Sequence, residues 1–260
     1  MVRLAAIQYR PPRADPDAAR RELAALCTQA AEEGARLVVC PEMATCGYVW
    51  RSAKEICPHV EPMEGPTFAI LSDVAKRSET WIVVGFPERL GSRLYNSALL
   101  IDTQGSLAAC YRKNLLFELD HAWASPGEDR VFLDTGFGSL FPAICMDLND
   151  WRMGVALRRL SPDIVAFCTN WVDKGSDVLS YWQAQLTGWQ GWFVAANTWG
   201  EERGVRFCGQ SRILGPGGRE VAAAGHTGNA IIFADATNLD ASGFPAGGKG
   251  SPDTERQQDA

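Results

Sequence analysis

Short apolar runs alternate with polar segments along most of the chain and predict strands at regular intervals. The expected strands are residues 2–9, 36–40, 81–86, 140–145, 163–169, 192–197 and 229–236. Residues 95–102 and 106–113 flank a short turn that ends in Gly105, so they predict an antiparallel hairpin. The Gly-Pro-Gly-Gly run at residues 215–218 predicts a second hairpin.

Helical segments are expected between these strands. Asp15 followed by Pro16 is typical of a helix start, because the aspartate caps free N–H groups and proline suits the first helical position. Gly34 predicts the end of this helix. Further helices are expected at residues 66–78, 151–160 and 177–190. The alternation with hairpins indicates an α/β fold, in which helices cover one face of each of two packed sheets.

No linker divides the first 240 residues, so we expect one domain over residues 1–240. From Ala241 the chain reads ASGFPAGGKGSPDTERQQDA, which is rich in glycine, proline and charge and has no periodicity. Such a composition predicts a flexible tail over residues 241–260.

Composition narrows the class of protein. The 260 residues are 46% hydrophobic and 22% charged, as in globular proteins that dissolve in water. A net charge of −6 and the lack of a basic run argue against nucleic acid and anionic membranes as partners. No apolar run reaches the roughly 18 residues of a membrane helix, and the N-terminus turns polar at Gln8, too early for a secretory signal. We therefore expect a cytoplasmic protein.

Several active-site patterns can be rejected. The sequence has no G-x-S-x-G elbow and no H-E-x-x-H motif, and its 3 scattered histidines argue against a multi-histidine metal site. The 8 cysteines are scattered without a C-x-x-C pair, which predicts mostly buried core residues. GFPAGGKG approaches a phosphate-binding loop, but Gly250 stands where a hydroxyl should coordinate magnesium. We therefore expect no metal site and no phosphate-binding loop.

Three reactive side chains share one kind of position, at or just past the end of an apolar strand: Glu42, Lys113 and Cys145. Ligands of such sheets gather at the carboxyl ends of strands. Glu42 could accept the thiol proton, and Lys113 could lower the thiol pKa and stabilise negative charge on a substrate. A helix start after Cys145 would add backbone N–H donors. Each residue alone is more often structural, but their shared position favours a joint reactive centre.

The blocks that contain these residues resemble the signature regions of the nitrilase, or carbon–nitrogen hydrolase, superfamily: RLVVCPEMATCGY, YRKNLLFELDHAWASPGE and FPAICMDLNDWR. The resemblance implies a four-layer α-β-β-α sandwich that forms a homodimer or a larger homo-oligomer and needs no cofactor. It also implies a triad with Glu42 as general base, Lys113 as oxyanion stabiliser and Cys145 as nucleophile. The backbone N–H of Met146 would be a second oxyanion donor.

Within the superfamily, CMDLN and RKNLLFELDHAWASPG look like the protein N-terminal amidase branch. The leading hypothesis is therefore an amidase that converts a primary carboxamide to an acid and ammonia through a cysteine thioester. Its substrate would be a small-molecule amide or an N-terminal residue of a peptide. Nitrile or carbamoyl hydrolysis on the same triad is the alternative, and a catalytically silent binding protein is a hypothesis of another class.

One position departs from the family pattern. Many members carry a second glutamate soon after the lysine, and the corresponding register here holds His121, with Glu118 and Glu128 nearby as possible substitutes. Asn170 and Trp171 follow a strand where family members place substrate-contacting residues, so the resemblance makes them candidates for substrate contact.

Overall fold

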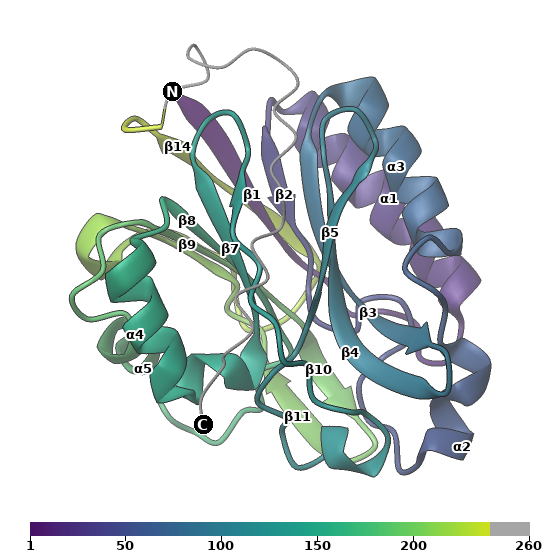
Figure 1. Ribbon diagram of the computed structural model, residues 1–260. Coiled ribbons are helices and arrows are strands. Elements are labelled where there is room, and N and C mark those ends of the chain that lie inside the picture. The colour runs from purple at the N-terminus through teal and green to yellow at the C-terminus, as the bar shows by residue number, and fades with distance from the viewer. Residues whose placement is uncertain (240–260) are drawn as a thin grey trace, which may run out of the picture.

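The computed structural model describes residues 1–239 and shows two six-stranded mixed sheets packed face to face, with helices outside them (Figure 1). One sheet has the strand order β14-β1-β2-β3-β4-β5 and the other β13-β12-β9-β8-β7-β6. The expected four-layer α-β-β-α sandwich is confirmed. The predicted flexible tail at residues 241–260 lies outside the described residues.

The first sheet joins the N-terminal strands to the last strand of the described chain. Its strands are β1 (Val2–Gln8), β2 (Leu37–Val39), β3 (Trp81–Leu90), β4 (Arg93–Ile101), β5 (Leu107–Arg112) and β14 (Ala230–Ala236). Strands β1, β2 and β3 run parallel, whereas β14, β4 and β5 add antiparallel pairs at the two sides.

The second sheet repeats this plan with a parallel centre. Its strands are β6 (Leu133–Asp134), β7 (Ser139–Ile144), β8 (Ile164–Thr169), β9 (Trp192–Asn197), β12 (Arg212–Gly215) and β13 (Arg219–Ala223). Strands β7, β8 and β9 are parallel, and β6, β12 and β13 pair antiparallel. The parallel centre places the ends of β7 and β8 side by side.

The helices cover the outer faces of the sheets. They are α1 (Pro16–Glu32), α3 (Pro66–Ser78), α4 (Trp151–Leu160) and α5 (Val178–Gln185), whereas the four-residue α2 (Ala53–Ile56) packs in a cluster of loop residues that includes Tyr48. Apolar residues of α1 and α3 pack against the first sheet, and those of α4 and α5 against the second (Figure 1). Single turns of 3-10 helix lie at Cys57–His59, Asp120–Ala122, Cys145–Asn149 and Pro216–Gly218.

The largest apolar cluster fills the space between the two sheets. Leu4 and Val39 of the first sheet share it with Ile164 and Val194 of the second, and all four are fully buried. Cys145 belongs to the same cluster. The predicted nucleophile therefore lies at the end of the central core rather than on an outer face.

Local sequence signals explain most element boundaries. The side chain of Asp15 accepts a hydrogen bond from the Ala18 N–H at 3.0 Å, as expected for a helix cap. Helices α3 and α4 have the predicted bounds, but α5 is shorter than the predicted 177–190. The hairpin of β10 (Trp199–Glu202) and β11 (Val205–Cys208) was not predicted, because its short strands are rich in charge and lack clear apolar alternation.

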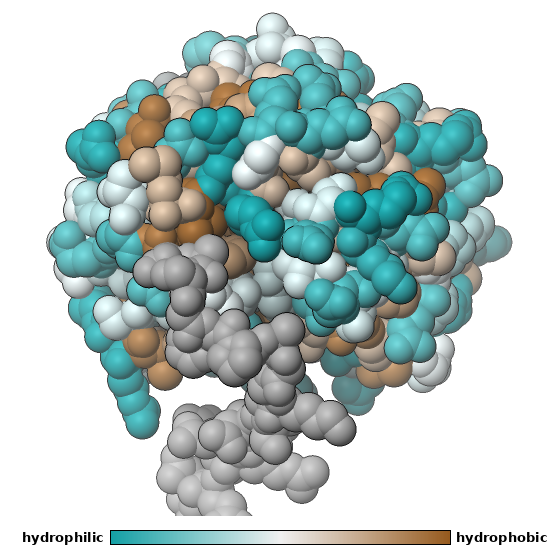
Figure 2. All heavy atoms as spheres, turned by 90° about the horizontal axis from the view of Figure 1, so that it is seen from above, coloured by the Kyte–Doolittle hydropathy of each residue, from teal (hydrophilic) through white to brown (hydrophobic). Residues whose placement is uncertain are grey.

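The surface is of mixed polarity. Figure 2 shows polar and apolar side chains interspersed on the face seen from above. Within residues 1–239, no helix is both long enough and apolar enough to span a membrane.

Gly85 of β3 gives a test of the packing beneath the loop that carries Glu42. A Cβ at this position would lie 2.5 Å from the Glu42 Cα and 2.5 Å from the Pro41 carbonyl oxygen. Gly85→Ala should lower the free energy of unfolding by roughly 1–3 kcal/mol, because backbone atoms must move. The control Gly154→Ala lies in helix α4 with only the flexible Arg158 side chain near it, so it should be neutral or stabilising. Equal denaturant midpoints for wild type and Gly85→Ala would contradict this packing.

Candidate active site

Two predicted site residues from different strand ends meet inside the protein. Glu42 follows β2 and Lys113 follows β5, and the Lys113 Nζ lies 2.7 Å from the Glu42 Oε1. Both side chains are fully buried. The ends of these strands therefore bring a carboxylate and an ammonium group together, as their positions in the sequence predicted.

Lys113 has a second carboxylate partner that the sequence analysis missed. Its Nζ lies 2.5 Å from the Asp120 Oδ2, and Asp120 is fully buried. The other Asp120 oxygen accepts a hydrogen bond from Asn96 at 3.2 Å. Asp120 thus occupies the place beside the lysine that we expected for a second glutamate.

The three residues proposed for that place were wrong. His121, Glu118 and Glu128 are all exposed, whereas Asp120 begins the 3-10 turn that directs its side chain inward. The Phe117 N–H donates to the Asp120 Oδ2 at 3.0 Å and fixes this turn. The buried carboxylate therefore belongs to Asp120, the residue directly before the exposed His121.

Glu42 is held in place by three donors. Its Oε1 accepts from Asn96 Nδ2 at 2.7 Å as well as from Lys113, and its Oε2 accepts from the Asn170 N–H at 2.9 Å. Asn96 lies on β4 and Asn170 directly follows β8, so strands of both sheets orient this carboxylate. The Glu42 Oε1 is thereby bound by side chains of the first sheet, and the Oε2 by a backbone N–H that follows a strand of the second sheet.

The charges in this cluster shift one another's pKa. Burial alone would lower the pKa of Lys113, but the adjacent carboxylates of Asp120 and Glu42 outweigh it and raise the pKa above its usual value. Burial raises the pKa of Glu42, and the charge of Asp120 raises it further, although Lys113 acts in the opposite direction. The structure therefore favours a permanently charged lysine beside a carboxylate that accepts protons more readily than an exposed glutamate.

Cys145 lies at a sharp corner between β7 and the 3-10 turn Cys145–Asn149. Its φ of 42° is in the left-handed region, which non-glycine residues rarely occupy and which often marks functional sites. Met146 follows at the start of the turn, where backbone N–H groups have no partner within the turn. The predicted corner after the strand is therefore present, but the prediction that it exposes the sulfur was wrong, because Cys145 is buried.

The expected low thiol pKa was wrong in its net direction. Lys113 does lower the pKa of Cys145, but burial and the charge of Glu42 are stronger, and they raise it above the usual value. The thiol is therefore protonated at neutral pH in the resting protein. A nucleophilic role would need a base that takes the proton as the sulfur attacks.

Asp147 joins the corner at Cys145 to the strand end at Lys113. Its Oδ2 accepts from the Ile144 N–H at 2.9 Å and from the Tyr111 hydroxyl at 2.7 Å. Its Oδ1 accepts from the N–H groups of Asn114 and Leu115 at 3.0 and 2.9 Å. One buried carboxylate thus fixes the end of β7 in the second sheet against the end of β5 in the first.

The two candidates for substrate contact lie next to this cluster but differ in surroundings. Asn170 is buried and contacts Glu42 through its backbone, and its Oδ1 has no hydrogen-bond partner among the described residues. Trp171 is half-buried, and its ring packs against Tyr181 and Trp182 at centroid distances of 5.6 Å. Asn170 is therefore the nearer of the two to the buried charges.

The part of the chain that the structure describes contains no group of three or more His, Cys, Asp or Glu side chains arranged to hold a metal ion. The two carboxylates of the cluster, Glu42 and Asp120, instead form ion pairs with the Lys113 ammonium group.

Comparison with known proteins identifies the family. Residues 3–240 match the family described as carbon-nitrogen hydrolase. The chain is 32% identical to a nitrilase of Pyrococcus abyssi over 245 residues, covering 90% of this chain and 89% of that protein. It is 28% identical to the protein N-terminal amidase of Schizosaccharomyces pombe over 226 residues, covering 70% and 79%.

A solved structure agrees with these relatives. The crystal structure of an amidase from Nesterenkonia sp. superimposes with a TM-score of 0.81 and 25% identity, covering 91% of this chain and 90% of that chain. The chain belongs to the carbon–nitrogen hydrolase family of the nitrilase superfamily. It is an enzyme of the class that hydrolyses carbon–nitrogen bonds other than peptide bonds.

The Asp147 contact gives a direct test of how the site is held together. Asp147→Asn should lower the free energy of unfolding by roughly 1.5–3 kcal/mol, because an amide nitrogen would face N–H donors that now bind a carboxylate. Tyr111→Phe removes only one of the four donors and should cost about 1 kcal/mol. Urea denaturation measures both changes. If Asp147→Asn were no less stable than Tyr111→Phe, the backbone contacts of Asp147 would not fix the corner.

Proposed function

We propose that the protein is a thiol-dependent amidase that hydrolyses a primary carboxamide to an acid and ammonia. The observation that carries the proposal is the buried Glu42–Lys113 pair, with its 2.7 Å contact, beside the strained corner at Cys145. A base, a cation and a thiol then surround one point at the ends of strands from both sheets. The intact cluster argues against a catalytically silent binding protein.

The first step forms a thioester. As the Cys145 sulfur attacks the carboxamide carbon, Glu42 takes the thiol proton, which the raised pKa of the thiol requires. Lys113 and the Met146 N–H stabilise the oxyanion that develops on the former carbonyl oxygen. Glu42 then gives its proton to the departing nitrogen, and ammonia leaves as the C–N bond breaks.

The second step returns the enzyme to its resting state. Glu42 takes a proton from water, and the resulting hydroxide equivalent attacks the thioester carbon. The C–S bond breaks, the sulfur recovers its proton from Glu42, and the carboxylic acid is released. The sum is one amide and one water converted to one acid and one ammonia.

The relatives favour an amide as substrate but leave a second candidate. The protein N-terminal amidase among them supports a primary amide on a small molecule or on an N-terminal residue. The relative named nitrilase supports nitrile hydrolysis, which would use the same thioester. The expected homodimer or larger assembly and the cytoplasmic location remain predictions.

A panel assay separates these activities. Purified protein is incubated with acetamide, propionamide, glutamine, an Asn-terminal peptide, propionitrile and N-carbamoyl-β-alanine, and ammonia is measured together with the acid product. We expect turnover of at least one amide and its loss in Cys145→Ala, because that change removes only the nucleophile. The control Cys57→Ala changes an exposed cysteine whose sulfur contacts Arg89 outside the cluster, and it should keep wild-type rates. Turnover of the nitrile alone, or an active Cys145→Ala, would overturn the proposal.

The pH profile tests whether Glu42 is the base. Glu42 accepts a proton only when ionised, so kcat/KM should fall as pH drops through its raised pKa. Asp120→Asn removes a negative charge that raises this pKa, so the acid limb should move to lower pH while the maximal rate falls. His121→Ala should leave the limb unchanged because His121 is exposed. The assignment would be contradicted if the acid limb of kcat/KM stayed at the same pH in Asp120→Asn, or if it moved in His121→Ala.

A further inference from the structure

Tyr48 reaches the catalytic cluster from a loop that the mechanism above does not use. The loop Cys46–Ser52 follows Glu42 after a few residues, and the Tyr48 ring centroid lies 5.8 Å from the Lys113 Nζ. The side chain is buried, with 2% of its surface exposed. The Tyr48 and Phe207 rings also form a T-shaped pair at a centroid distance of 6.0 Å. Its hydroxyl thus lies among the groups that surround the proposed reaction.

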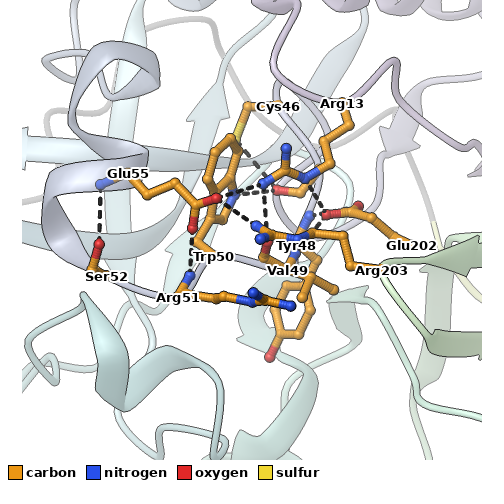
Figure 3. A network of polar contacts seen from close by, with 11 residues as sticks. Arg13, Cys46, Tyr48, Val49, Trp50, Arg51, Ser52, Glu55, Glu202 and Arg203 are labelled. Atoms are coloured by element: carbon orange, nitrogen blue, oxygen red, sulfur yellow. Dashed lines mark hydrogen bonds and ion pairs between the residues drawn. The ribbon is translucent and has the colours of Figure 1, made fainter.

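A network of ion pairs holds the backbone of this loop. Glu202 accepts from the N–H groups of Tyr48 and Val49 at 3.0 and 2.7 Å and from Arg13 Nε at 3.1 Å. Arg13 also lies over the Trp50 ring, 4.2 Å from its centroid. Figure 3 shows the Tyr48 ring pointing away from this network. The network therefore fixes the Tyr48 backbone and leaves its hydroxyl free to make a contact elsewhere.

The Tyr48 hydroxyl makes no hydrogen bond of normal geometry among the described residues, although the Asp120 carboxylate lies close enough to influence its pKa. A buried hydroxyl without a partner destabilises a protein, and such groups call for an explanation. Tyr48 also lines a small cleft together with Asn170, Thr198 and Phe207, and the Asn170 side-chain oxygen is likewise without a partner in this part of the chain. Two residues with unused polar atoms therefore line one cleft, and the backbone of one of them, Asn170, contacts Glu42.

We propose that the Tyr48 hydroxyl binds the substrate by a hydrogen bond to its carboxamide. This inference rests on the proposed amidase function and adds a substrate-binding residue to the same site. Burial, followed by the charges of Asp120 and Glu42, raises the pKa of Tyr48 well above its usual value. The hydroxyl therefore keeps its proton and can donate to the carbonyl oxygen of an amide.

Tyr48→Phe tests this role because it removes the hydroxyl and keeps the ring. We expect kcat/KM for the best amide of the panel to fall roughly five- to tenfold, mainly through a higher KM, since a substrate contact is lost. Tm should stay within about 1 °C of wild type or rise, because the hydroxyl makes no protein hydrogen bond of normal geometry. Circular dichroism melting and ammonia release measure the two quantities on the same preparations.

Tyr9→Phe is the matched control. Tyr9 is fully buried in the apolar cluster between the first sheet and helices α1 and α3, and its hydroxyl donates to the Glu22 carboxylate at 2.8 Å. This variant should lose about 2–4 °C in Tm and keep kcat/KM. If Tyr48→Phe behaves like Tyr9→Phe, or if its kcat/KM stays within 1.5-fold of wild type (about the error of such assays), the Tyr48 hydroxyl is structural and the proposal is overturned.

Binding to an inactive protein separates this proposal from the proposed function. Propionamide and glutamine are added to Cys145→Ala and to Cys145→Ala/Tyr48→Phe, and the rise in Tm is recorded. A rise that is smaller by half or more in the double variant supports the Tyr48 contact even if wild type releases no ammonia. An equal rise in both proteins, or no rise in either, overturns it.

Discussion

The fully buried ammonium group of Lys113 is the constraint on which the site depends. A cation removed from water is costly unless opposite charges and hydrogen bonds replace its hydration. Glu42 and Asp120 supply two carboxylates at 2.7 and 2.5 Å. These groups come from the end of β2 and from the loop after β5, so the lysine can be charged only when the first sheet and that loop are both formed. Folding and assembly of the site are therefore linked.

The second sheet contributes the thiol, and two contacts connect it to the charges. Asn170 donates its backbone N–H to Glu42, and Asp147 fixes the corner at Cys145 to the chain that follows Lys113. Burial at this junction, together with the charge of Glu42, raises the pKa of the thiol. A protonated thiol beside a proton-accepting carboxylate fits a reaction in which proton transfer and attack occur together. Because burial raises the pKa of the thiol, Cys145 needs Glu42 as a base before it can attack.

The sequence predicted the strand ends well and the loops poorly. Glu42, Lys113 and Cys145 could be found because apolar runs report where strands end, and parallel strands place those ends together. Asp120 was missed because its inward direction depends on a single 3-10 turn, which no periodicity reveals. The sequence analysis did not single out Asp147, although a carboxylate two residues after the thiol could have suggested a backbone anchor. The β10–β11 hairpin, which carries Glu202, has strands of only four residues each, too short for a clear pattern.

Trapping the covalent intermediate would test the central claim most directly. Protein mixed with its best amide substrate is quenched in acid within the first turnover, and the digest is examined by mass spectrometry. The account predicts a peptide that contains Cys145 and is heavier by the acyl group of that amide, with hydroxylamine removing the added mass as expected for a thioester. Turnover with the acyl group on another residue, or with no acyl-enzyme under any quench time, would contradict it.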